Sequence, residues 1–171
     1  IPSNYNLLDI GGGRGGDLHR WSKSHVNKVV TVEPNNDNLK ELKLRLADSD
    51  LKNRVVPVNT IGEDTVQITD KVNEEIKDKV DVISLMLSMS FFWASERHIN
   101  ALVRTIVHNL KLGGHVLFFT IYNKLEDELV ENQLQLNDAK FTFYDDKYVR
   151  ANIPGIVDRQ WEFIVKINQL T

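Results

Sequence analysis

The sequence predicts an α/β fold in which a mostly parallel, twisted sheet carries helices on both faces. The first observation is an apolar run, Asn6–Ile10, followed at once by five glycines in the six positions 11–16. The second is the alternation of short β-branched runs with helical patterns, which is typical of a parallel sheet with right-handed crossovers. The third is that the early runs are apolar on both faces, as buried parallel strands are.

The glycine cluster points to a ligand site. Glycines directly after an apolar strand let the backbone approach a bound molecule closely, because no Cβ intervenes. In an open α/β sheet, such a turn lies at the crevice where ligands bind. The segment 11–17 is therefore interpreted as the binding loop for a nucleotide-like cofactor.

Apolar and β-branched runs predict three strands in the first third of the chain, and the segments after the first two predict helices. The expected strands are Asn6–Ile10, Lys28–Val32 and Arg54–Val58. The expected helices are Asp17–Ser24 and Asn38–Ala47. The second strand is expected to stop at Glu33-Pro34, which places an acidic residue at its end.

The second half of the chain continues the alternation. Apolar residues recur with helical spacing over Ile99–Leu110, and Gly113-Gly114 is interpreted as the stop of that helix. The other expected elements are a polar helix or loop at Thr69–Lys79, strands at Val80–Leu87 and His115–Tyr122, a helix at Lys124–Gln135, late strands at Lys140–Tyr144 and Glu162–Ile167, and a loop or insertion at Ala151–Asp158.

The composition is that of one ordinary globular domain, with 171 residues, 42% of them hydrophobic and 26% charged. No apolar run approaches the ~18 residues of a membrane span, and the absence of cysteine excludes disulfides and cysteine-based zinc sites. The net charge of −3 favours local rather than broad contact with any nucleic acid. Because no initiator Met is present, we expect residues 1–171 to be a single domain of a longer, intracellular protein.

Two kinds of cofactor fit the glycine loop. Gly11, Gly13 and Gly16 match G-x-G-x-x-G, the pattern of nicotinamide and flavin sites. Glu33 ends the second expected strand, where a carboxylate accepts hydrogen bonds from both hydroxyls of an adenosine ribose. That carboxylate suits dinucleotides and S-adenosylmethionine equally. Arg14 and His19 are interpreted as surface residues.

Asp9 favours S-adenosylmethionine over a dinucleotide. Asp9 lies two residues before the first glycine. Its carboxylate would repel a pyrophosphate bound at the loop and attract an ammonium group. In addition, Leu8–Gly15 resembles the acid-containing glycine motif of class I methyltransferases, and Leu110–Leu117 resembles their Gly-Gly step into the fifth strand. This resemblance implies a Rossmann-like class I methyltransferase fold with a late antiparallel strand. A nicotinamide oxidoreductase remains a distant alternative.

A narrower resemblance covers most of the chain from Leu7 to Val165. Gly15-Gly16-Asp17-Leu18 followed by Trp21 resembles the GGDL continuation of messenger-RNA cap guanine-N7 methyltransferases, including the methyltransferase domain of large-DNA-virus capping enzymes. The segment 84–91 lies where that family has Q-F-x-x-H-Y-S-F, and 161–165 resembles its late P-E-[FY]-[IL]-[VI] stretch. The resemblance implies methyl transfer to N7 of the guanine cap of mRNA, in a viral or cellular setting.

The resemblance also implies the cofactor contacts. Asp9, Gly11, Gly13 and Asp17 match the residues at the methionine end of S-adenosylmethionine, and Glu33 matches the ribose acid. Four further positions match the adenine or the rest of the cofactor: Asn59, Thr60, Ser84 and Leu85. Asn59 is an amide where the family has an acid, so its adenine contact differs in charge.

The implied guanine site departs from the family. Ser88 and Met89 align with a His-Tyr pair that normally helps to hold the cap guanine, while Ser90-Phe91 keeps the Ser-Phe that follows. Guanine binding would then use Phe91, Phe92 or Trp93. Glu162 matches the acid that accepts hydrogen bonds from the guanine N1–H and exocyclic amine.

The implied reaction needs neither an acid–base residue nor a metal, because guanine N7 carries a lone pair and no proton. The expected partners are the capped 5′ end of an RNA and other domains or a subunit of a capping enzyme, with no membrane. The expected location is the cytoplasm or virion for a viral protein and the nucleus for a cellular one. A class I methyltransferase acting on another RNA, a protein or a small molecule, and an inactive subunit with the same fold, remain alternatives.

Overall fold

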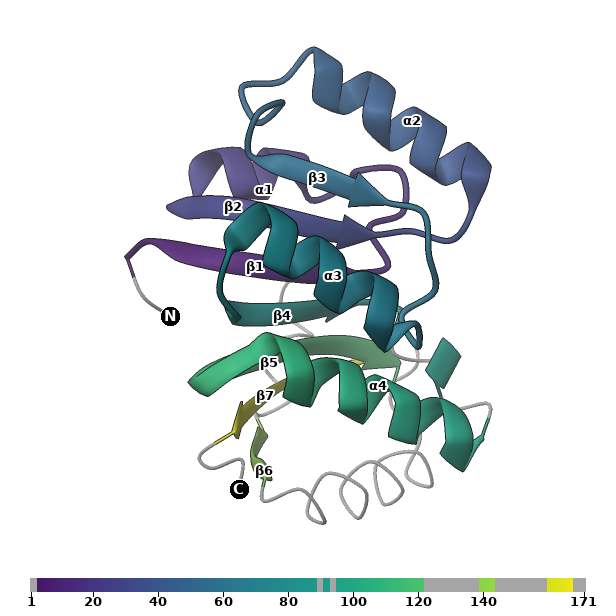
Figure 1. Cartoon of the computed structure of the whole chain (residues 1–171), viewed down its shortest axis with the longest axis vertical. Coiled ribbons are helices and arrows are strands. Elements are labelled where there is room, and N and C mark those ends of the chain that lie inside the picture. Colours follow the sequence, from purple (N-terminus) through teal and green to yellow (C-terminus); the bar gives the residue numbers. More distant parts are fainter. Residues whose placement is uncertain (1–2, 89–90, 93–94, 122–138, 144–159, 168–171) are drawn as a thin grey trace.

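A computed structural model describes residues 3–88, 91–92, 95–121, 139–143 and 160–167 of the chain (Figure 1). Its strands are β1 (Tyr5–Ile10), β2 (Val26–Val32), β3 (Val55–Val58), β4 (Val80–Met86), β5 (Leu110–Ile121), β6 (Ala139–Phe143) and β7 (Gln160–Ile167). Its helices are α1 (Leu18–Lys23), α2 (Asn36–Ala47), α3 (Thr65–Ile76) and α4 (Glu96–Asn109).

The strands form one seven-stranded sheet in the order β3-β2-β1-β4-β5-β7-β6. Neighbours from β3 through to β5 are parallel, whereas β7 is antiparallel to both β5 and β6. The predicted α/β class, with a mostly parallel sheet and a late antiparallel strand, is confirmed. Because β1 to β4 run in the same direction, the loops that follow them meet at one edge of the sheet, which is called the carboxyl edge below.

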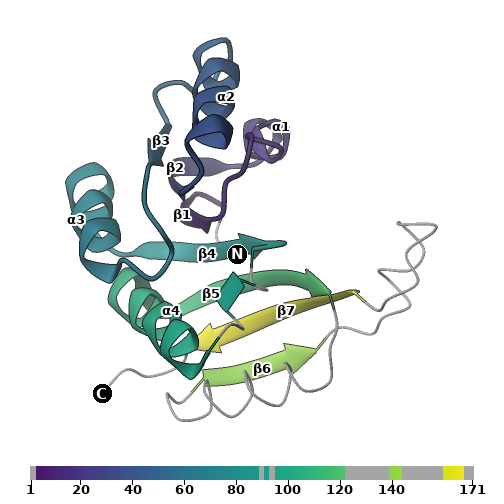
Figure 2. The ribbon, with the colours of Figure 1, turned by 90° about the vertical axis from the view of Figure 1, so that its right-hand side faces the viewer.

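Helices cover both faces of the sheet, as predicted (Figures 1 and 2). Leu7 and Leu8 show the reason, because neighbouring residues of a strand point to opposite faces. Leu7 packs in a cluster with residues of α1 and α2, and Leu8 packs in a second cluster with residues of α3 and α4. The two clusters enclose the sheet, so the strands are apolar on both sides.

Several boundaries differ by a few residues from the sequence predictions, and two of these differences have a visible cause. The helix expected at Thr69–Lys79, or a loop in its place, is α3, which begins four residues earlier because Asp64 caps it by accepting a hydrogen bond from the Gln67 N–H. Gly113-Gly114 does not stop α4. The backbone is already extended at Leu110, and both glycines lie inside β5. The helix expected at 124–135 and the loop expected at 151–158 lie outside the described residues.

Candidate functional site

The loop after β1 approaches its neighbours so closely that two of its glycines admit no side chain. A Cβ on Gly11, whose φ is +93°, would lie 2.4 Å from the Ser88 Cβ. A Cβ on Gly12 would lie 2.1 Å from the Thr31 Oγ1. A Cβ on Gly13 would have no atom within 4 Å. Gly11 and Gly12 therefore pack the loop against the sheet, and Gly13 presents bare backbone to open space.

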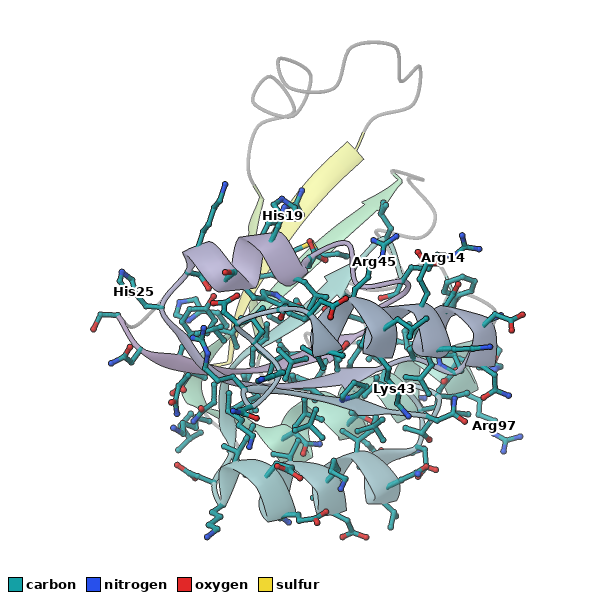
Figure 3. All side chains as sticks on the ribbon, turned by 90° about the horizontal axis from the view of Figure 1, so that it is seen from above. Arg14, His19, His25, Lys43, Arg45 and Arg97 are labelled. Carbon is teal, nitrogen blue, oxygen red and sulfur yellow. The ribbon has the colours of Figure 1, made fainter. Side chains whose placement is uncertain are left out.

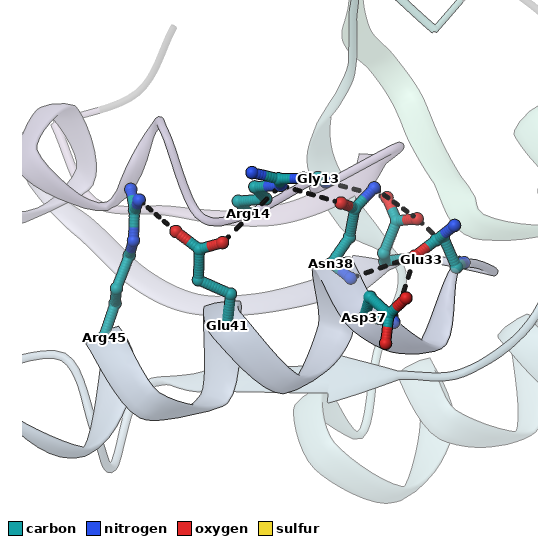
Figure 4. Close-up of polar contacts among 8 residues, drawn as sticks. Gly13, Arg14, Glu33, Asp37, Asn38, Glu41 and Arg45 are labelled. Carbon is teal, nitrogen blue, oxygen red and sulfur yellow. Dashed lines mark hydrogen bonds and ion pairs between the residues drawn. The ribbon is translucent and has the colours of Figure 1, made fainter.

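The Glu33 carboxylate holds this loop. It is almost fully buried, and its Oε2 accepts a hydrogen bond of 2.8 Å from the Gly13 N–H. Its Oε1 accepts from the Asn35 N–H at 2.8 Å and from the Asn38 amide at 3.4 Å (Figure 4). A carboxylate offers about four lone-pair sites, so these three donors leave capacity for a ligand hydroxyl.

Arg14 connects the glycine loop to α2. Its Nε donates to the Asn38 Oδ1 at 3.1 Å and lies 3.5 Å from the Glu41 Oε2, while Arg45 also pairs with Glu41 (Figure 4). The Arg14 side chain is 67% exposed, which agrees with its interpretation as a surface residue. Asn38 thus joins Arg14 to Glu33 and restrains the loop from its outer side.

Asp9 lies beneath the loop and is buried. The Thr31 Oγ1 donates to its Oδ2 at 2.9 Å, and the Ser84 Oγ donates to its Oδ1 at 2.7 Å. Burial raises the pKa of the Asp9 carboxyl to about 6, despite these hydrogen bonds, and the negative charges of Asp17 and Glu33 raise it further. The carboxyl edge therefore concentrates negative charge around the glycine loop, which favours a cationic ligand group over a pyrophosphate.

We expect Asp9→Asn to stabilise the unliganded protein. Because the folded pKa is above the unfolded value of 3.8, the folded state is favoured at low pH and this advantage is lost as the pH rises through about 6. The variant should melt on the order of 4 °C above the wild type near pH 7. Near pH 5 the gap should shrink, since the carboxyl of the wild type is then mostly protonated. Differential scanning calorimetry at both pH values measures this gap, and an equal gap at both would exclude a buried charge as its cause.

Asp17 stands at the start of α1 and is half-buried. It accepts a hydrogen bond of 2.7 Å from Arg20. Together with Ser84 and Met86, it lines a cavity of about 100 Å³ between α1 and the face of the sheet that α1 covers. The structure thus places Asp17 and Ser84, both predicted cofactor residues, beside one small cavity.

Asn59 and Thr60 follow β3 at the same edge. The Asn59 amide nitrogen donates to the backbone oxygens of Glu33 at 3.1 Å and of Pro34 at 3.3 Å. The Asn59 Oδ1 has no hydrogen-bond partner among the described residues. Although Asn59 stands where the family has an acid, this oxygen can therefore still accept a hydrogen bond from a ligand. Thr60 is buried, and its hydroxyl donates to the Asp64 carboxylate at 3.3 Å.

Two predicted site residues have other roles in the structure. The Leu85 side chain is fully buried in the cluster beneath α3 and α4, so it faces the core. Ser88 was predicted to contact the guanine, and in the structure its side chain faces the glycine loop. Its side chain is 6% exposed, packs against Gly11 and donates to the backbone oxygen of Ile10. Ser88 therefore supports the glycine loop, because the turn after β4 brings it under the end of β1.

The aromatic residues after β4 divide into two roles. Phe91 is 75% exposed, whereas Phe92 is buried against Ile10 and Gly62 and belongs to the core. Leu87, at the start of this turn, is also exposed and has a φ of +63°, which is an unusual conformation for a residue with a side chain. Phe91 is therefore the aromatic residue of this pair that remains accessible to a substrate. Met89 and Trp93 lie outside the described residues.

Ser88→Ala tests the structural role of this serine. We expect the free energy of unfolding to fall by about 1 kcal/mol, because the buried oxygen of Ile10 loses a donor. The KM for capped RNA should change less than about twofold, since the loss acts on the free energy of unfolding rather than on substrate contacts. Urea denaturation and steady-state kinetics measure the two quantities. A large rise in KM with unchanged stability would return Ser88 to the substrate site.

Strand register places Glu162 at the carboxyl edge. Met86, at the end of β4, pairs with Phe119 on β5, and Phe119 pairs with Glu162 on β7. Because β7 is antiparallel to β5, its first residues lie where the parallel strands end. The backbone of Glu162 is therefore two strands from the end of β4 and at the same edge as the glycine loop.

Two residues of the site were missed by the sequence analysis. Thr31 bonds to Asp9, and Asn38 bonds to both Glu33 and Arg14. The only signal for Thr31 is a hydroxyl inside an otherwise apolar strand, and no signal marks Asn38 because its partners come from two other segments.

Within the described residues, no group of His, Cys, Asp and Glu side chains forms a metal site. None of the described helices has the length and apolar character that a membrane span requires.

Comparison with known proteins identifies the family. A sequence model described as the mRNA (guanine-N(7))-methyltransferase domain matches residues 2–149, which is most of the chain. The chain belongs to this mRNA (guanine-N(7))-methyltransferase family. The family resemblance inferred from the glycine motif is thereby confirmed.

Curated relatives agree with this family. An mRNA cap guanine-N(7) methyltransferase from Eremothecium gossypii is 22% identical over 96% of this chain and 44% of its own length. Another from Caenorhabditis briggsae is 25% identical over 85% of this chain and 45% of its own length. The chain therefore spans less than half the length of either relative. One of these organisms is a fungus and the other a nematode, so neither relative supports the predicted viral setting.

Solved structures agree with the fold. The glycopeptide N-methyltransferase MtfA aligns with a TM-score of 0.73 at 12% identity, over 98% of this chain and 85% of that chain. A methyltransferase of Streptococcus mutans, solved in complex with SAH, aligns with a TM-score of 0.65 at 14% identity, over 97% and 90% of the two chains. The Rossmann-like class I methyltransferase fold is confirmed by these neighbours.

Proposed function

We propose that this chain, within a longer protein, transfers a methyl group from S-adenosylmethionine to N7 of the guanine cap of mRNA. The observation that carries the proposal is the family match over residues 2–149, which includes the whole glycine loop and Glu33. The match extends from β1 through β6 and therefore covers the four strands, β1 to β4, that carry the candidate cofactor residues.

The described residues fit this cofactor. Bare backbone at Gly13 allows close approach, and the Glu33 carboxylate beside it would accept a hydrogen bond from a ribose hydroxyl. Asp17 and the buried Asp9 supply negative charge near the loop, which suits a ligand that carries an ammonium and a sulfonium. The free Oδ1 of Asn59 would accept a hydrogen bond from the adenine amino group.

The protein's own task in this reaction is positioning. The bound cofactor would supply an activated methyl group on a sulfonium, and guanine N7 would attack with its lone pair. The chain would hold the two reactants in line and exclude water between them, which is worth up to roughly 7–11 kcal/mol of the barrier. The methyl transfer from sulfur to N7 requires no proton transfer, so the site needs no general base.

Cap recognition is assigned to Glu162 and Phe91. Glu162 would accept hydrogen bonds from the guanine N1–H and exocyclic amine, and it is at the carboxyl edge by register. Phe91 is exposed near the end of β4 and would stack on the base. The family's His-Tyr pair is absent here, and the Ser88 hydroxyl already bonds to Ile10, which leaves fewer polar contacts for the guanine.

The experiment that tests the proposal compares substrates and cofactors on the full-length protein. We expect methyl transfer from S-adenosylmethionine to capped RNA and none to the same RNA without a cap. S-adenosylmethionine and its demethylated product should raise the melting temperature, whereas NAD should not. Methylation of uncapped RNA, protein or a small molecule instead would favour another class I substrate. Absence of cofactor binding would favour an inactive subunit with this fold.

The biological setting is part of the same proposal. A cap methyltransferase would work beside the other domains or a subunit of a capping enzyme, on the 5′ end of an RNA. Its location would be intracellular, in the nucleus for a cellular protein. The fungal and nematode relatives support a cellular setting more than a cytoplasmic or virion location of a viral protein.

A further inference from the structure

Two arginines of α4 stand apart from the other arginines of the described segments. Arg14, Arg20, Arg45 and Arg54 each form an ion pair with a carboxylate. Arg97 and Arg104, the other two described arginines, are exposed, and neither guanidinium group forms an ion pair or hydrogen bond with any described residue. Figure 3 shows Arg97 extending away from the body of the molecule.

Both arginines line the same open cavity. Its volume is about 480 Å³, which is within the range of ~300–1,000 Å³ typical of ligand sites. Ile61 and Ala101 form its apolar part, and Glu63, Asp64 and His98 complete the lining. The residues from 61 to 64 follow Asn59 and Thr60 directly, so the cavity begins beside the candidate cofactor edge and continues onto the face covered by α3 and α4.

Arg97 and Arg104 are seven residues apart, which is about two helical turns or ~10 Å along α4. At this distance the two guanidinium groups suit two separate phosphates rather than one. Arginine binds phosphate through a planar fork of donors, and no carboxylate among the described residues occupies either fork. The net charge of −3 means that RNA cannot be held by a general excess of positive charge, so this local pair of arginines gains importance.

We propose that this cavity binds the phosphates of the RNA chain that follows the cap. This inference rests on the proposed function, because it takes capped RNA as the substrate. Two acids, Glu63 and Asp64, also line the cavity, and their negative charge disfavours a small inorganic anion. Asp64 already accepts hydrogen bonds from Gln67 and Thr60, and Glu63 lies 3.9 Å from His98 and would accept a hydrogen bond from a ribose hydroxyl.

The test compares the double variant Arg97→Ala/Arg104→Ala with the wild type of the full-length protein. Binding of a capped RNA of about 20 nucleotides is measured by fluorescence anisotropy at several salt concentrations. We expect affinity to fall about tenfold near physiological salt, and the slope of log K against log salt to fall by about 1.4, since each single-strand phosphate contributes about 0.7. The KM for a cap dinucleotide should stay the same, because it lacks the following chain.

A matched control uses two exposed lysines of α2, Lys40 and Lys43, which also have no partner among the described residues but lie on the opposite face of the sheet. Lys40→Ala/Lys43→Ala should leave RNA affinity within about twofold of the wild type. Arg97→Lys/Arg104→Lys should keep the salt slope, because the charge is retained. Inorganic phosphate at millimolar concentration should not displace the RNA.

Several outcomes would overturn the inference. They are unchanged binding of the long RNA by the arginine variant, an equal loss for the lysine variant, and an equal rise in the KM for the cap dinucleotide. Displacement of RNA by millimolar inorganic phosphate would assign the cavity to a small anion instead. Failure of the wild type to methylate the cap dinucleotide would overturn the proposed function separately, so the two failures are distinguishable.

Discussion

Glu33→Gln is expected to weaken the binding of S-adenosylmethionine by about 100-fold. The Glu33 side chain is 5% exposed and accepts hydrogen bonds from Gly13, Asn35 and Asn38. A glutamine supplies one acceptor oxygen and turns an amide N–H₂ toward one of these N–H groups. Loss of charged hydrogen bonds costs about 1.5–3 kcal/mol each, so loss of the loop contact and the ribose contact together corresponds to roughly two powers of ten.

Titration calorimetry with S-adenosylmethionine and with its demethylated product measures this loss. Glu75→Gln is the control, because Glu75 is a half-buried carboxylate that pairs with Lys28 at 3.1 Å and lies on α3, away from the glycine loop. The control should bind the cofactor within about twofold of the wild type. Unchanged cofactor affinity in the folded Glu33→Gln variant would remove Glu33 from the site.

Glu162→Ala is expected to lower kcat/KM for cap methylation by about 100-fold and to leave cofactor affinity nearly unchanged. A site that hydrogen-bonds a polar group of its substrate loses several kcal/mol when that contact is removed, because the buried partner is left unpaired. The strand register keeps Glu162 on β7, separated from β1 and β2 by β4 and β5, so the cofactor contacts are not altered directly.

A substrate comparison makes this prediction specific. An inosine cap lacks the exocyclic amine, so the wild type should prefer the guanosine cap and Glu162→Ala should lose most of that preference. Lys166→Ala is the control on the same strand, because Lys166 pairs with His115 at the start of the parallel strands, far from the carboxyl edge. Equal loss of methylation and of cofactor affinity in Glu162→Ala would show that this residue acts elsewhere.

Most of the fold could be predicted from the sequence because its signals are local. Each strand from β1 to β5 is an apolar run, and α4 shows apolar residues at helical spacing. The start of β5 was predicted at His115 because Gly113-Gly114 looks like a helix stop, although β5 begins at Leu110, which pairs with Val80. Pairing with a strand 30 residues away decided that boundary, and no local pattern contains it.

The residues of the candidate site also divide into those that the sequence predicts and those that depend on the tertiary structure. The glycine loop and Glu33 could be predicted because each directly follows a strand, and parallel strands bring such positions to one edge. Asn59 was predicted from the family resemblance. Ser88 was assigned to the substrate because its position in the sequence matches a substrate pair. Its contact with Ile10 depends on how the turn after β4 folds back, which spacing does not reveal.

The sequence by itself determined the order of the elements, the α/β class, the family and the edge of the sheet that carries the candidate site. These follow from patterns within about ten residues, such as an apolar run followed by glycines. Only the tertiary structure decided which polar groups hold the loop and which are free. Thr31, Ser84 and Ser88 meet β1 across separations of 22, 75 and 78 residues. Such bonds form because packing of the sheet brings their strands together, and the same packing leaves Arg97 and Arg104 without a carboxylate partner among the described residues.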